Sequence, residues 1–168
     1  MELEARDYEL IGRIIVETAV LDGRLIELAI RLAWQSRTNA TFESLQVEFR
    51  GLSGRELRQR LDALVRATGE GPDRESFASL AERVAERQEV RNALAHNMQF
   101  GLPDGRIVGF RTTPKPSRSS TSEVTTLTIQ DRAGLEENLR LVREVSQEAL
   151  DWVNRFPRPP SRMHTSGN

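Results

Sequence analysis

Apolar residues recur every three or four positions between residues 4 and 34, the spacing that places side chains on one face of an α-helix. Two adjacent sets make a stripe wide enough for a largely buried helix: Leu10, Ile11, Ile14, Ile15, Ala19, Leu21, Leu25, Ile26, Leu28, Ala29, Leu32 and Ala33. Asp22-Gly23 interrupts the run, so we expect a bend or a split there. Asp22 also falls on the packed face, where a buried carboxylate needs a partner. An ion pair with an arginine, a cap at a helix break and a role in a site are the alternatives.

Two more helices are predicted before residue 100. Residues 35–52 are rich in Ser, Thr and Asn, and we expect a connection with at most one helical turn. Ser53 resembles the N-cap of a helix that runs to about Thr68, and GEGPD at 69–73 ends it. The next helix begins near Arg74, and one broad face of it carries Phe77, Leu80, Ala81, Val84, Gln88, Arg91, Leu94, Ala95 and Met98.

The periodicity then changes from helical to alternating. PDG at 103–105 is a turn signal, and RIVGFRT and SEVTTLTIQ are β-type runs separated by a Pro- and Ser-rich segment, so we expect a hairpin insertion at about 103–130 with a mobile tip. Asp131 opens a last helix to about Phe156. The predicted fold class is all-α: an antiparallel bundle of four to five helices with an inserted β-hairpin before the last helix. We expect a single domain over residues 1–156 and a disordered tail at 157–168.

Composition excludes several functional classes. The 168 residues carry 24 Lys+Arg against 25 Asp+Glu, a formal net charge of -1, so no global field attracts nucleic acid or a membrane. The absence of cysteine excludes disulfides and thiol nucleophiles. MELEARDYEL does not resemble a signal peptide, and no stretch is apolar enough to span a bilayer. We therefore expect a cytoplasmic protein with no membrane association.

The segment VRNALAHN holds the candidate chemistry. Asn92 and His96 are four residues apart and share a helix face, and the long side chain of Arg91 can reach the same region. A histidine that exchanges protons near neutral pH, an arginine that holds an anion and an orienting amide suffice to cleave a phosphodiester through a neighbouring 2'-hydroxyl, which RNA has and DNA lacks. No metal or other cofactor is expected, because cysteines, a second ordered histidine and an HExxH motif are all missing. One histidine does not comfortably serve as both general base and general acid, and a homodimer would supply two.

On these residues the chain resembles the HEPN superfamily (higher eukaryote and prokaryote nucleotide-binding domains), in which an arginine, a polar residue, three further residues and a histidine end a helix of a bundle. The run ETAVLDGRLIELAIRL is similar to the long first helix of such domains. The resemblance implies a metal-independent endoribonuclease site across a homodimer, often in toxin-antitoxin, abortive-infection or CRISPR-associated defence systems. Arg91 would hold the scissile phosphate, His96 would transfer a proton, and Asn92 would orient them or contact the RNA.

The chain departs from that pattern in two places. HEPN toxins paired with a nucleotidyltransferase antitoxin have a tyrosine two residues after the histidine, whereas this chain has Met98, which argues against that pairing and leaves any other antitoxin or operon partner open. The inserted hairpin is not part of the minimal bundle. Its basic residues are candidate RNA contacts, with a solvated loop as the alternative: Arg106, Arg111, Lys115 and Arg118.

Two competing interpretations remain. In one, the chain is a HEPN-like bundle without catalysis that binds a nucleotide or a protein, or regulates a neighbouring enzyme. In the other, Arg91 pairs with Asp22 to fasten two helices while His96 caps a helix end. A carboxylate can orient a catalytic arginine as well, so an Asp22 contact alone would not separate these interpretations from the ribonuclease.

Overall fold

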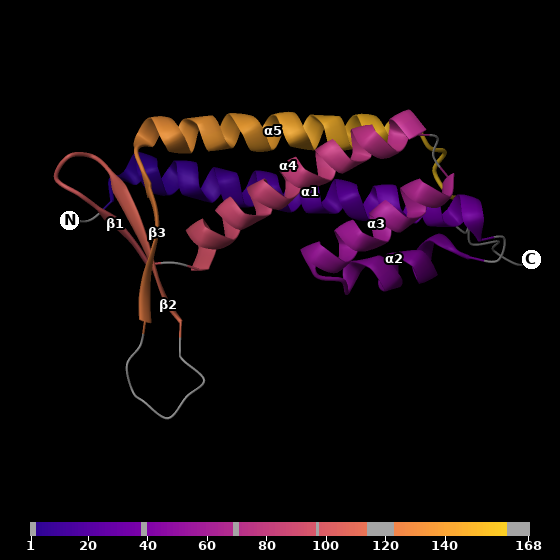
Figure 1. Ribbon diagram of the computed structural model, residues 1–168, viewed down its shortest axis with the longest axis horizontal. Coiled ribbons are helices and arrows are strands. Elements are labelled where there is room, and N and C mark those ends of the chain that lie inside the picture. The colour runs from indigo at the N-terminus through magenta and orange to yellow at the C-terminus, as the bar shows by residue number, and fades with distance from the viewer. Residues whose placement is uncertain (1–2, 38–39, 69–70, 97, 114–122, 161–168) are drawn as a thin grey trace, which may run out of the picture. The chain divides into compact units, whose positions relative to one another are not determined.

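The computed structural model describes residues 3–37, 40–68, 71–96, 98–113 and 123–160 (Figure 1). Its elements follow the order α1, α2, α3, α4, β1, β2, β3 and α5. The chain divides into two compact units. Met1–Thr18 and Glu86–Arg143 form the first unit, and Ala19–Ala85 and Glu144–Asn168 form the second. The single domain expected over residues 1–156 stays a prediction.

The predicted fold class is confirmed. The described residues contain five helices, and antiparallel strands are inserted before the last of them. None of the described helices combines the length and the apolar composition that crossing a membrane requires.

Helix α1 (Ala5–Ser36) is continuous, so a split at Asp22-Gly23 is wrong, whereas a bend there stays a prediction. Gly23 is exposed, and a Cβ built at this position would meet no atom within 4 Å. A glycine in a helix costs only about 1 kcal/mol relative to alanine. The flanking Leu21 and Leu25 are almost completely buried, and burial of this kind outweighs that cost.

In the first unit, the strands form one antiparallel sheet in the order β1-β2-β3. Strand β1 (Met98–Gly101) pairs with β2 (Ile107–Thr113), which pairs with β3 (Glu123–Gln130). The predicted hairpin is confirmed as β2 and β3. Strand β1 was not predicted, because its four residues are too few to stand out from the helical spacing that Met98 continues. The expected PDG turn joins β1 to β2, and Gly105 adopts the positive φ of 80° that this turn requires. The predicted mobile tip lies outside the described residues.

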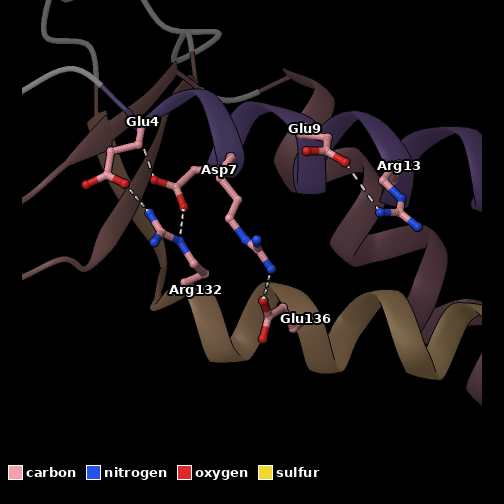
Figure 2. A network of polar contacts seen from close by, with 7 residues as sticks. Glu4, Asp7, Glu9, Arg13, Arg132 and Glu136 are labelled. Atoms are coloured by element: carbon pink, nitrogen blue, oxygen red, sulfur yellow. Dashed lines mark hydrogen bonds and ion pairs between the residues drawn. The ribbon is translucent and has the colours of Figure 1, made fainter.

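Ion pairs fasten the start of α1 to the start of α5 (Arg132–Asn154), as Figure 2 shows. Arg132 donates to the buried carboxylate of Asp7 at 2.8 Å and to Glu4 at 2.6 Å. Its guanidinium holds the pKa of Asp7 below the ordinary value. One turn along α5, Glu136 accepts from Arg6 at 3.2 Å. This cluster fixes two chain segments that are 125 residues apart in sequence.

In the second unit, helix α2 (Phe42–Arg50) occupies half of the connection expected at 35–52, where at most one helical turn was expected, so that expectation is wrong. A capping box explains the helix: Thr41 Oγ1 accepts from the Ser44 amide at 3.2 Å, and Ser44 Oγ accepts from the Thr41 amide at 3.1 Å. Leu45 and Phe49 anchor its inner face. Leu45 and Phe49 are four residues apart, which is helical spacing, but the polar residues around them obscured the pattern.

Helix α3 (Gly54–Thr68) begins and ends where the sequence predicts. Ser53 accepts from the amide of Glu56 at 3.3 Å, and the Glu56 carboxylate accepts from the amide of Ser53 at 2.8 Å. Helix α4 (Gly71–His96) starts three residues earlier than expected. GEGPD therefore does not only end a helix: its Gly-Pro-Asp opens the next one, since proline is favoured in the first turn, where its missing N–H costs nothing.

The core of the second unit is built around Trp152, which packs edge-on against Phe77 with 5.5 Å between ring centroids. Other buried residues of this unit come from α1, α2, α3, α4 and α5: Leu25, Leu28, Leu32, Leu45, Phe49, Leu61, Leu80, Ala149 and Val153. Most of the expected tail, residues 161–168, lies outside the described residues, whereas Pro159 is buried.

Candidate functional site

The candidate site lies in the first unit, where α4 ends. His96 is the last residue of α4, so the expectation that the helical face extends to Met98 is wrong: Met98 begins strand β1. Asn92 and His96 are both exposed and lie about one helical turn apart, while Arg91 is half-buried beside them. No hydrogen bond or ion pair links His96 to either residue among the described residues. The last turns of α4 thus present an amide and an imidazole to solvent next to a partly sheltered guanidinium.

Arg91 has an unusual set of partners. Its Nη1 donates to Asn92 Oδ1 at 2.8 Å. Its Nε is buried and has no hydrogen-bond partner in the part of the chain that the structure describes. No carboxylate of the same unit forms an ion pair with Arg91 among the described residues. A neutral amide orients this guanidinium and leaves its positive charge uncompensated within the unit.

Strand β1 fixes the end of the helix that carries these side chains. Gln99 Nε2 donates to the backbone oxygen of Ala93 at 3.1 Å. Ala93 lies in the last turn of α4, where carbonyl groups have no partner within the helix. The side chain of Gln99 therefore caps the helix end around His96. No sequence pattern predicts this contact, because it depends on a strand that was not predicted.

A second contact secures α4 one turn before Arg91. Arg87 Nη1 donates to Asn138 Oδ1 of α5 at 2.8 Å, and Asn138 Nδ2 donates to Gln130 Oε1 at the end of β3 at 3.2 Å. The side chain of Arg87 is only 12% exposed. These bonds join α4, α5 and the sheet. Arg87 was not a predicted site residue, although its four-residue spacing from Arg91 places both arginines on one face of the helix.

The other predicted site residues are one aspartate of α1 and the basic residues of the hairpin insertion. Asp22 is half-buried in the second unit and has polar interactions of its own, so its predicted role beside Arg91 stays a prediction. Arg106 is exposed and donates to Asp104 at 2.6 Å, and this carboxylate raises the pKa of Arg106. Arg111 pairs with Thr125 in the β2–β3 ladder. Lys115 and Arg118 lie outside the described residues.

Among the described residues, no group of three or more acidic or histidine side chains is arranged to hold a metal ion. Comparison with protein-family models, curated proteins and solved structures finds no match to the chain. The residues at the end of α4 are therefore the basis for assigning a function.

Proposed function

We propose that the C-terminal end of α4 forms part of a metal-independent endoribonuclease site. Arg91 binds the scissile phosphate, His96 transfers a proton, and Asn92 keeps the guanidinium in place. The 2'-oxygen attacks phosphorus after losing its proton to a base, and the bond to the 5'-oxygen breaks as that oxygen gains a proton. The products are a 2',3'-cyclic phosphate, which can hydrolyse to a 3'-phosphate, and a 5'-hydroxyl.

The hydrogen-bond partner of Arg91 is the main support for this proposal. Arg132, which ties α1 to α5, meets the carboxylate of Asp7. Arg91 instead bonds to a neutral amide through one of its five N–H groups, which leaves donors for a phosphate. Phosphate oxygens match the fork of a guanidinium, and the exposed imidazole of His96 lies nearby on the same helix end.

A homodimer completes the proposed chemistry. General acid–base cleavage needs a group on each side of the phosphorus. His96 is the one histidine of the described residues, so a second copy of the chain would provide the second imidazole. The homodimer rests on this requirement and on the HEPN resemblance.

The proposed biological role is that of a toxin or defence effector held in check by an operon partner, and it rests on the resemblance alone. Expressing the chain without a partner should slow growth, and His96→Ala should relieve the effect. Equal growth of cells that carry either version, at equal protein levels, would argue against a toxin.

The activity is tested with purified protein and a mixed RNA pool in EDTA. Wild type should cleave, whereas Arg91→Ala and His96→Ala should each lower the rate by about 100-fold or more. Arg13→Ala, at an exposed arginine of α1, and His164→Ala, at the other histidine, are the matched controls and should cleave normally. Intact RNA with folded, dimeric wild type would favour the non-catalytic binding module, and equal loss in the controls would exclude a specific role for Arg91 and His96.

A further inference from the structure

The second unit contains a pocket that the proposed ribonuclease does not use. Its volume is about 260 Å³. The lining comes from α1, α2 and the segment after α5: Gly23, Ile26, Glu27, Ile30, Phe42, Gln46, Arg50 and Arg158. Ligand sites typically combine apolar walls with a few convergent polar groups, and their volumes begin at about 300 Å³. The size of this pocket therefore suits a ligand with a single ring or a short branched chain.

The charged groups of the pocket leave an excess of positive charge. The carboxylate of Glu27 accepts two hydrogen bonds from Arg31, at 2.6 and 3.2 Å, so its charge is already balanced. Arg50 and Arg158 are exposed, and neither forms an ion pair among the described residues. Two guanidinium groups at the mouth of one cavity favour an anion, and a carboxylate is the smallest planar group that matches their fork.

The backbone segments that carry these two arginines are held in place before any ligand binds. Arg31 donates to the backbone oxygens of Val153 and Phe156 at 3.0 and 2.8 Å, which fastens the chain just before Arg158. Pro157 and the buried Pro159 flank Arg158 and restrict its backbone. Arg50 ends α2, whose start is fixed by the Thr41 capping box. Preorganised groups lose less entropy on binding.

The apolar side chains of the pocket indicate the chemistry of the uncharged part of the ligand. Ile30 is almost fully buried, and Ile26 and Phe42 are half-buried, so these three side chains offer an apolar wall. Gln46 adds a neutral amide next to them. We propose that this pocket binds a small organic carboxylate with an aromatic or branched apolar body, its carboxylate held by Arg50 and Arg158 and its body against Ile26, Ile30 and Phe42.

The test is titration of the isotope-labelled full chain with phenylacetate, followed by NMR. Phenylacetamide, which has almost the same shape and no charge, is the matched ligand control. We expect phenylacetate to shift the resonances of Ile26 and Ile30 with a dissociation constant of roughly 0.1–1 mM, the range that suits about ten heavy atoms. Phenylacetamide should bind roughly tenfold more weakly or worse.

Three variants separate the pocket from other basic surfaces. Arg50→Ala and Arg158→Ala should each weaken phenylacetate binding roughly tenfold, whereas Arg55→Ala, at an exposed arginine of α3 outside the lining, should bind like wild type. Gly23→Leu should abolish binding while the protein stays folded, because the added side chain starts in open space and then fills the cavity. The proposal would be overturned if no resonance shifts at phenylacetate concentrations up to about 20 mM, which is twenty times the weakest expected dissociation constant. Equal binding of phenylacetamide, or unaltered binding of phenylacetate by Gly23→Leu, would also overturn it.

Discussion

At the end of α4, a neutral amide holds the guanidinium of Arg91, with 2.8 Å between Nη1 and Asn92 Oδ1. An amide oxygen orients a guanidinium without neutralising it, whereas a carboxylate does both. The difference matters for a group that must bind a phosphate, because a phosphate would have to compete with a carboxylate for the same donors.

This arrangement makes Asn92→Asp more harmful than Asn92→Ala. The new carboxylate would form an ion pair with Arg91 and repel the phosphate, whereas alanine only releases the guanidinium. We expect cleavage in single-turnover assays to fall by about tenfold or less in Asn92→Ala, the worth of one ordinary hydrogen bond, and by a further tenfold or more in Asn92→Asp. If Asn92→Asp cleaves as fast as Asn92→Ala, Asn92 does not act through Arg91.

Arg132 illustrates the opposite case, an arginine whose role is structural. It holds the pKa of Asp7 below the ordinary value of 3.8, so the ionised form of Asp7 stabilises the folded state. That contribution is complete above the unfolded pKa and is lost as the pH falls through the lower, folded pKa.

Arg132→Gln should therefore destabilise the protein near neutral pH and should matter less in acid. The check is urea unfolding of both proteins near neutrality and at about pH 3, where the difference in the free energy of unfolding should shrink because Asp7 becomes protonated in the variant. An undiminished difference in acid would mean that Arg132 stabilises through packing instead of through the charge of Asp7.

At the scale of elements, α1 shows how an exposed glycine is tolerated. The helix continues through Gly23 because the leucines around it are buried, although glycine itself disfavours the helix. The position is open, so a methyl group can be added there without a clash.

Gly23→Ala should raise the free energy of unfolding by about 0.5–1 kcal/mol, because alanine loses less backbone entropy in a helix. Gly105→Ala is the contrasting variant and should destabilise, since its φ of 80° is strained for any residue with a Cβ. Chemical denaturation of the three proteins measures both changes. A destabilised Gly23→Ala would show that the helix needs the glycine.

The elements that the sequence predicts well are those with a local cause. Ser53 and Asp131 cap α3 and α5 as expected. Each side chain accepts from an amide three residues ahead, so the cap depends only on nearby residues and can be predicted from the local sequence. Helix α2 was missed although Thr41 caps it in the same way, because polar residues surround its two buried anchors, Leu45 and Phe49. Strand β1 was missed because such a short strand depends on its tertiary contacts. The same limit applies to the site: Arg91, Asn92 and His96 follow from spacing, whereas the bond from Gln99 to Ala93 depends on where β1 lies.

At the scale of the whole molecule, the candidate site and the carboxylate pocket lie in different units. The candidate site occupies the unit that holds the sheet, and the pocket occupies the unit built around Trp152. The two proposals are therefore independent, and each can fail without the other.

A homodimeric site predicts a particular dependence on concentration. Cleavage per chain should stay constant at high protein concentration and should fall in proportion to concentration once the dimer dissociates. Initial rates measured over a dilution series, together with sedimentation, test this expectation. A constant rate per chain for a demonstrated monomer would contradict the composite site.

Cleavage at a single defined linkage tests whether the 2'-hydroxyl is the nucleophile. An RNA oligonucleotide cut by wild type in EDTA should be compared with the same oligonucleotide carrying one 2'-deoxynucleotide on the 5' side of the cut. Attack by the 2'-oxygen predicts that cleavage at that linkage disappears and that the unmodified RNA yields a cyclic or 3'-phosphate and a 5'-hydroxyl. Continued cleavage of the deoxy-substituted linkage, or 3'-hydroxyl ends, would contradict it.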